Sequence, residues 1–153
     1  MTPNCRRETI SADELARHLP PSGLYQVMFK LDRPLAQRVG ALGECLFKAG
    51  FWVYTGSARR ALGARIARHA ARDKRPHWHI DYLLPPGRVV AARVVSISAA
   101  SECGLHEALA ERFVEGPAGF GSSDCACRSH LVYVGKKALL TEGFFEILRP
   151  ESR

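Results

Sequence analysis

The sequence has no apolar run long enough to cross a bilayer, and its first ten residues lack the apolar segment of a secretory signal. We therefore expect a cytoplasmic protein without membrane contact. In that compartment disulfides are rare, so the five cysteines are expected to be reduced thiols or metal ligands. Internal repeats, low-complexity tracts and linkers are also missing, which predicts that residues 1–153 form a single domain.

Acidic residues are scarce relative to basic ones. There are 15 Asp and Glu against 22 Lys and Arg, and the formal net charge is +7. Such a balance favours a polyanionic partner, above all nucleic acid. Residues 58–72 contain no acidic residue at all. The arginines of this segment are Arg59, Arg60, Arg65, Arg68 and Arg72.

Hydrophobic periodicity predicts a small mixed fold. Strands are predicted at 23–31, 51–54, 89–97 and 131–134, with a hairpin within 35–49 and a last edge strand at 144–148. Helices are predicted at 11–19, 58–72 and 101–112. Ser11 and Glu14 have the spacing of a capping box, and Ser101 is the predicted cap of the third helix. The fold class is therefore α/β in the α+β sense: a small, mainly antiparallel sheet flanked by helices.

Two tyrosines, Tyr25 and Tyr54, lie near glycines in predicted strands. A tyrosine hydroxyl can act as a general base if nearby cations lower its pKa from about 10. The alternative is a pair of half-buried strand tyrosines whose hydroxyl groups lie at the surface.

The helix predicted at 58–72 carries Arg65 and His69 four residues apart, so both side chains lie on one face. Arginine binds phosphate through two parallel hydrogen bonds, and an imidazole can transfer a proton. Leu62 and Ile66 are predicted to face the core. The alternative for the arginines is a solvated cationic face with His69 packed at its edge.

Two further clusters could bind a metal. If residues 77–84 formed a strand, His77, His79 and Asp81 would point the same way, a donor set that suits a transition metal or could orient a phosphate. Cys125, Cys127 and His130 could supply three zinc ligands, with Cys103 as a fourth. The Cys-x-Cys spacing is tighter than the usual Cys-x2-Cys, so we favour buried thiols over zinc.

The motif pair Gly23-Leu24-Tyr25 and Val53-Tyr54-Thr55-Gly56 resembles the signature of the GIY-YIG nuclease superfamily. Further blocks resemble one branch of it: YTGSA at 54–58, RIARH at 65–69, HWHIDY at 77–82, EC at 102–103 and FGSSDC at 120–125. That branch is a domain of unknown function, found alone or fused to endonuclease III-type DNA-repair enzymes. The resemblance covers roughly residues 20–135, which leaves a short N-terminal helix at 11–19 and a C-terminal edge segment at 136–153.

The resemblance implies a GIY-YIG-like core and a catalytic site. In the superfamily the two motif tyrosines and the helix arginine surround the scissile phosphate, and a glutamate on a later helix binds a divalent metal. The catalytic residues implied here are Tyr25, Tyr54, Arg65 and His69. The implied ligand of Mg²⁺ or Mn²⁺ is Glu102 rather than Glu107, which lies about 140° away on a helix. Two departures are the long gap between the tyrosines, where the extra hairpin is predicted, and Ser57 in place of a common lysine.

The implied function is metal-dependent cleavage of phosphodiester bonds in nucleic acid, with DNA repair or processing as the expected context. Binding is expected to be mainly electrostatic. The expected contacts to nucleic acid are Arg59, Arg60, Arg68, Arg72 and His79. The alternatives are a catalytically silent nucleic-acid-binding module of the same fold and a zinc-stabilised interaction domain.

Overall fold

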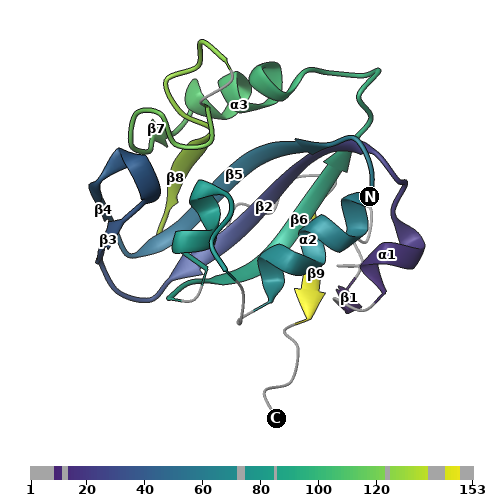
Figure 1. The fold of residues 1–153 in the computed structure, drawn as a ribbon, viewed down its shortest axis with the longest axis horizontal. Helices are drawn as coiled ribbons and strands as arrows, with labels where there is room; N and C mark the ends of the chain where they lie inside the picture. Colours follow the sequence, from purple (N-terminus) through teal and green to yellow (C-terminus); the bar gives the residue numbers. More distant parts are fainter. Residues whose placement is uncertain are drawn as a thin grey trace, which may run out of the picture.

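A computed structural model describes residues 9–11, 14–71, 75–84, 86–122, 125–137 and 144–148. The architecture is α+β with a mainly antiparallel sheet and helices packed on it, which confirms the predicted fold class (Figure 1). None of the helices in the described ranges is both long enough and apolar enough to span a membrane.

The main sheet has seven strands in the order β1-β9-β6-β2-β5-β8-β7. Only β1 and β9 pair in parallel among the described strands. Their bounds are β1 Thr9–Ser11, β2 Gly23–Leu31, β5 Gly50–Ala58, β6 Arg88–Val95, β7 Val114–Glu115, β8 Leu131–Gly135 and β9 Phe145–Leu148. A separate hairpin pairs β3 Leu35–Arg38 with β4 Glu44–Phe47. The helices are α1 Leu15–His18, α2 Leu62–Ala70 and α3 Glu102–Ala110, with 3-10 turns η1 Gly40–Leu42 and η2 His79–Tyr82.

Layers of side chains cover both faces of the sheet, because alternate residues of the central strands are buried on opposite faces. Tyr25 and Phe29 of β2 pack in one core cluster with Ile66 of α2. Met28 belongs to a second, smaller cluster, against which Leu109 of α3 packs. Helix α2 therefore lies over one face, in front of β2 and β6 in Figure 1, and α3 packs on the other.

Several predicted elements are confirmed. Strand β2 has the predicted bounds, and the hairpin predicted in the long gap between the tyrosines is β3–β4. Leu62 and Ile66 are buried, as the helical spacing of α2 predicts. The Oγ of Ser101 accepts a hydrogen bond from the backbone N–H of Gly104 at 2.9 Å, so Ser101 does cap α3.

Two predictions are wrong. The first helix does not begin at Ser11, which ends β1; it begins at Leu15, and Glu14 at the N-cap makes no side-chain cap bond. The last strand, β9, is not an edge strand, because β1 pairs with its outer side. The strand geometry considered for residues 77–84 does not occur: the 3-10 turn η2 lies there, so the side chains of this segment do not alternate between two faces.

Candidate active site

A polar pocket of about 280 Å³ lies where β5 ends and α2 begins. Its walls come from both layers and from the connecting segments. The lining residues are Tyr25, Tyr54, Gly56, Ser57, Arg65, His77, Trp78, His79, Glu102 and Gly121. Four residues singled out in the sequence, Tyr25, Tyr54, Arg65 and Glu102, thus meet at one cavity although they come from four different elements.

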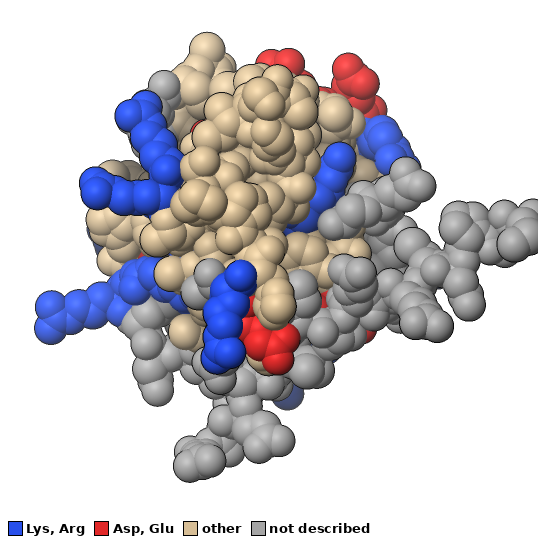
Figure 2. Space-filling view, turned by 90° about the vertical axis from the view of Figure 1, so that its right-hand side faces the viewer, with Lys and Arg blue, Asp and Glu red and all other residues tan. Residues whose placement is uncertain are grey.

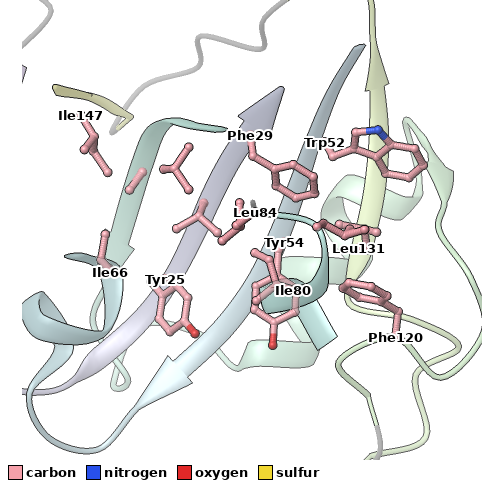
Figure 3. Packing of buried hydrophobic residues seen from close by; sticks show 14 of the residues in the cluster. Tyr25, Phe29, Trp52, Tyr54, Ile66, Ile80, Leu84, Phe120, Leu131 and Ile147 are labelled. Carbon is pink, nitrogen blue, oxygen red and sulfur yellow. The ribbon is translucent and has the colours of Figure 1, made fainter. Parts of the chain in front are cut away.

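The two tyrosines lie on adjacent antiparallel strands with ring centroids 6.4 Å apart. Figure 3 shows both hydroxyl groups pointing toward the same end of the sheet. Two glycines make room for them. A Cβ on Gly56 would lie 2.6 Å from the Tyr25 ring, and a Cβ on Gly121, whose φ is +67°, would lie 2.6 Å from the Tyr54 ring. The glycine after the second tyrosine therefore shapes the pocket around the first.

Burial raises the pKa of both tyrosines above its ordinary value. For Tyr25 the neighbouring Tyr54 adds to this effect, and the positive charge of Arg65 offsets only part of it. Burial is also the largest cause for Tyr54, followed by the negative charge of Glu102. The condition for a tyrosinate base, a lowered pKa, is therefore not met, and both hydroxyl groups stay protonated at neutral pH.

Tyr25 begins a chain of polar contacts that runs into the core. Its hydroxyl lies 3.0 Å from Nε2 of His69, which is fully buried. On the other side of the ring, Nδ1 of His69 lies 3.8 Å from Oδ1 of buried Asp81. A carboxylate on that side favours a proton on Nδ1 and leaves Nε2 as the acceptor for the Tyr25 hydroxyl.

Asp81 is the anchor of this chain. Its Oδ2 accepts hydrogen bonds from the backbone N–H groups of His77 at 2.8 Å and Trp78 at 2.9 Å, and Arg68 lies 3.3 Å away. Burial acts to raise the pKa of Asp81, but the imidazole of His69 nearby and the hydrogen bonds from the backbone N–H groups of Trp78 and His77 hold it well below its ordinary value. His77, His79 and Asp81 therefore do not share one face as a strand would have placed them, since Asp81 turns inward to bind its own loop.

We expect Asp81→Asn to lower the free energy of unfolding by about 3 kcal/mol at pH 7, because it removes one partner of a buried ionic network. A carboxyl group whose pKa is depressed in the folded state stabilises the fold at pH values above its unfolded-state pKa of about 4. This stabilisation is lost as the pH falls from there toward the folded-state pKa. Urea unfolding should therefore show a smaller difference between wild type and variant at pH 3 than at pH 7. Exposed Asp32, paired with Lys30 and Arg88, is the control: Asp32→Asn should cost less than about 1 kcal/mol. If Asp81→Asn lowered the free energy of unfolding by the same amount at pH 3 and at pH 7, this would contradict the depressed pKa of Asp81.

Arg65 of α2 lines the pocket. Its guanidinium donates to the carbonyl oxygen of Ser57 and lies over the ring of Trp78, 4.7 Å from the centroid. These two contacts orient a half-buried cation that lines the pocket, where a guanidinium can bind an anion.

Glu102 opens α3 and reaches the pocket from the opposite layer. Its Oε2 accepts from the Ser57 hydroxyl at 2.9 Å, and its Oε1 lies 3.1 Å from Nδ1 of His130. Burial acts to raise the pKa of Glu102, but the hydrogen bonds from His130 and Ser57 keep it below its ordinary value, so the carboxylate is ionised. Glu107 is exposed and does not line the pocket.

The predicted nucleic-acid contacts fall in different places. His79 lines the pocket, its Nδ1 accepts from the backbone N–H of Gly121 at 2.8 Å, and burial lowers its pKa. Arg59 and Arg60 are exposed between β5 and α2. Arg68 instead binds Asp81 and the carbonyl oxygen of Arg75. Arg72 lies outside the described residues.

The cysteine cluster consists of Cys103, Cys125, Cys127 and His130, whose ligand atoms all lie within 4.8 Å of one another. Such a group can hold a metal ion. The expectation of buried thiols is wrong, because none of the three cysteines is buried.

A family model described as a domain of unknown function, DUF123, matches residues 24–150. The chain belongs to the DUF123 family. The matched region contains every residue that lines the pocket and the whole cysteine cluster. Searches of curated proteins and of solved structures found no match.

Sequence reasoning did not find the links between these residues. It singled out His69 and Asp81, but not their contact, because the sequence did not fix the conformation of residues 77–84. It also missed the contact of His130 with Glu102, which joins the pocket to the cysteine cluster. One signal in the sequence could have shown this link. Glu102 and Cys103 are adjacent, so the start of α3 carries a candidate ligand of the pocket and a candidate ligand of the cysteine cluster.

Proposed function

We propose that this DUF123 protein is a nuclease of the GIY-YIG type that hydrolyses phosphodiester bonds in nucleic acid, most plausibly DNA. The observation that carries the proposal is the meeting of Tyr25, Tyr54, Arg65 and Glu102 around one polar pocket. Two hydroxyl groups, a guanidinium and one carboxylate are the groups that phosphate binding and metal-assisted hydrolysis require.

The phosphate would be held by donors that already face the pocket. Arg65 offers paired N–H groups, and the protonated Tyr54 hydroxyl offers an O–H. His79, neutral and accepting at Nδ1, carries its proton on Nε2 and adds a third donor. Because these groups are fixed by packing, they need little reorganisation when charge develops on the phosphate oxygens.

The attacking water would lose its proton through Tyr25. As the water oxygen attacks phosphorus, its proton passes to the Tyr25 oxygen while the Tyr25 proton passes to Nε2 of His69. The imidazolium that forms is stabilised by the Asp81 carboxylate beside Nδ1. The leaving oxygen takes its proton from solvent. Tyr25 stays neutral throughout, which agrees with its raised pKa.

Glu102 fits the divalent metal that such nucleases use. It is the only carboxylate among the described residues that line the pocket, and its oxygens keep lone pairs beyond the bonds from Ser57 and His130. Mg²⁺ commonly binds through one carboxylate and several waters. Bound Mg²⁺ or Mn²⁺ would stabilise the charge on the phosphate and on the leaving oxygen.

For the cysteine cluster we propose Zn²⁺. Three cysteines and one histidine are a usual ligand set of closed, four-coordinate zinc sites, whereas Mg²⁺ and Mn²⁺ prefer oxygen ligands. The two sites therefore differ in the metal they select, although they lie side by side.

The test is a cleavage screen of branched, nicked and single-stranded DNA and RNA with Mg²⁺, with Mn²⁺ and with EDTA. We expect cleavage of at least one substrate that requires the metal and is lost in EDTA. Binding without cleavage of any substrate would instead support a silent nucleic-acid-binding module.

Arg59 and Arg60 should contribute to binding rather than to chemistry. Figure 2 shows Lys and Arg side chains spread around one face of the molecule. If each arginine contacts one phosphate, replacing both by Gln should weaken binding to all sequences alike. The slope of log affinity against log salt should become shallower by about two.

The matched control for this prediction is Arg33→Gln with Arg38→Gln. These residues are also exposed, but Arg33 follows β2 at the end of the sheet opposite to Arg59, because β2 and β5 are antiparallel. Salt titrations of both double variants and of wild type give the comparison. An equal change of slope in the two double variants would show that only net charge matters.

A further inference from the structure

The cysteine cluster joins three separate parts of the chain. Cys103 lies in the first turn of α3, Cys125 and Cys127 lie in the loop that follows Gly121, and His130 precedes β8. Nε2 of His130 lies 3.4 Å from Sγ of Cys125 and 3.8 Å from Sγ of Cys103. Thiolate and imidazole donors gathered at this spacing can close around one ion with little movement of the backbone.

The two nitrogens of His130 face different sites. Nε2 faces the sulfur atoms, while Nδ1 lies 3.1 Å from Oε1 of Glu102. A histidine that binds a metal through Nε2 carries its proton on Nδ1 and usually donates it to a carboxylate, which fixes the ring. Here that carboxylate is the one that lines the active-site pocket.

We propose that Cys103, Cys125, Cys127 and His130 hold one Zn²⁺ and that Glu102 is the hydrogen-bond acceptor of the zinc-bound His130. Glu102 would then be shared between the two sites. The Ser57 hydroxyl of β5 donates to Oε2 of Glu102, while His130 faces Oε1. The carboxylate is therefore oriented by a zinc ligand on one oxygen and by β5 on the other.

Zinc would therefore act as a positioning device for the pocket. It ties the start of α3 to the loop before β8, and the start of α3 is where Glu102 emerges. The zinc site itself stands on the four ligands, whereas its effect on catalysis rests on the function proposed above.

The first test is the metal content of the purified protein. We expect about one Zn²⁺ per chain, and Co²⁺ exchanged into the site should give the visible absorption of a tetrahedral thiolate complex. Cys125→Ser should lose the ion, whereas Cys45→Ala, which changes a buried cysteine outside the cluster, should keep it. Wild type that binds neither ion, or that carries iron instead, would overturn the zinc assignment without any variant having to fold.

The second test measures zinc affinity by competition with a chelator. Glu102→Ala should weaken Zn²⁺ binding about 10- to 100-fold, because it removes the acceptor of the ligand histidine. Glu107→Ala, an exposed glutamate on the same helix, should leave the affinity unchanged. Unchanged affinity in Glu102→Ala would overturn the shared role of Glu102. Tight zinc binding with the expected loss, in a protein that cleaves no nucleic acid, would refute only the proposed function.

Discussion

Arg65→Ala is expected to reduce the rate of cleavage at saturating substrate by about a thousandfold or more, while affinity for nucleic acid falls only modestly. Arg65 lines the pocket, and its guanidinium is oriented by Trp78 and by the carbonyl oxygen of Ser57. Its positive charge matters most when charge builds on the phosphate in the transition state, so its loss should affect the chemical step more than binding. Single-turnover cleavage and equilibrium binding on the same substrate separate the two effects.

Two variants sharpen this prediction. Arg65→Lys keeps the charge but loses the paired N–H groups, so it should recover only a small part of the rate. Arg60→Ala removes an exposed arginine outside the pocket and should leave the chemical step unchanged. Equal losses of binding and cleavage in Arg65→Ala would mean that Arg65 only binds nucleic acid.

His69→Gln is expected to slow cleavage by about 10²- to 10⁴-fold, the usual contribution of a general base. Glutamine can still accept a hydrogen bond from the Tyr25 hydroxyl, but it cannot take up a proton. Tyr25→Phe should cause a loss of similar size, because it removes the group that passes the proton to His69. Circular dichroism and thermal unfolding confirm that each variant is folded before rates are compared.

The double variant Tyr25→Phe with His69→Gln decides whether the two residues act as one path. Groups that act as a unit give non-additive losses, so the double variant should be about as slow as either single one. A multiplicative loss would contradict the proton path. His106→Gln is the control, because His106 is also buried beside a carboxylate, Glu115 at 2.7 Å, but does not line the pocket.

The sequence predicted the parts of the site that depend on local periodicity. Alternation placed Tyr25 in a strand, and helical spacing placed Arg65 and His69 on one face of α2. Helical geometry also separated Glu102 from Glu107, and only Glu102 lines the pocket. One face of β2, formed by Tyr25, Val27, Phe29 and Leu31, is buried in the core cluster that also contains Ile66 of α2.

The remaining features depend on contacts between distant segments, which periodicity does not encode. Asp81 accepts hydrogen bonds from the backbone N–H groups of His77 and Trp78, and these local bonds stabilise a 3-10 turn where the sequence pattern left the conformation open. Ser11 has the right spacing for a helix cap, but its backbone pairs with Leu148 as part of the β1–β9 ladder instead. The sequence offered Cys103, Cys125, Cys127 and His130 as a possible metal set, and the structure brings these four together, although the tight Cys-x-Cys spacing had favoured buried thiols.

The central claim is that this pocket holds the scissile phosphate beside a divalent metal. Crystals of the wild-type protein grown with Mn²⁺ and a short non-hydrolysable oligonucleotide test it directly, because anomalous scattering locates the manganese. We expect one Mn²⁺ on the Glu102 carboxylate and a backbone phosphate on the Arg65 guanidinium, within reach of the Tyr25 and Tyr54 hydroxyl groups. An oligonucleotide bound elsewhere on the surface, with neither metal nor phosphate in the pocket, would contradict the account.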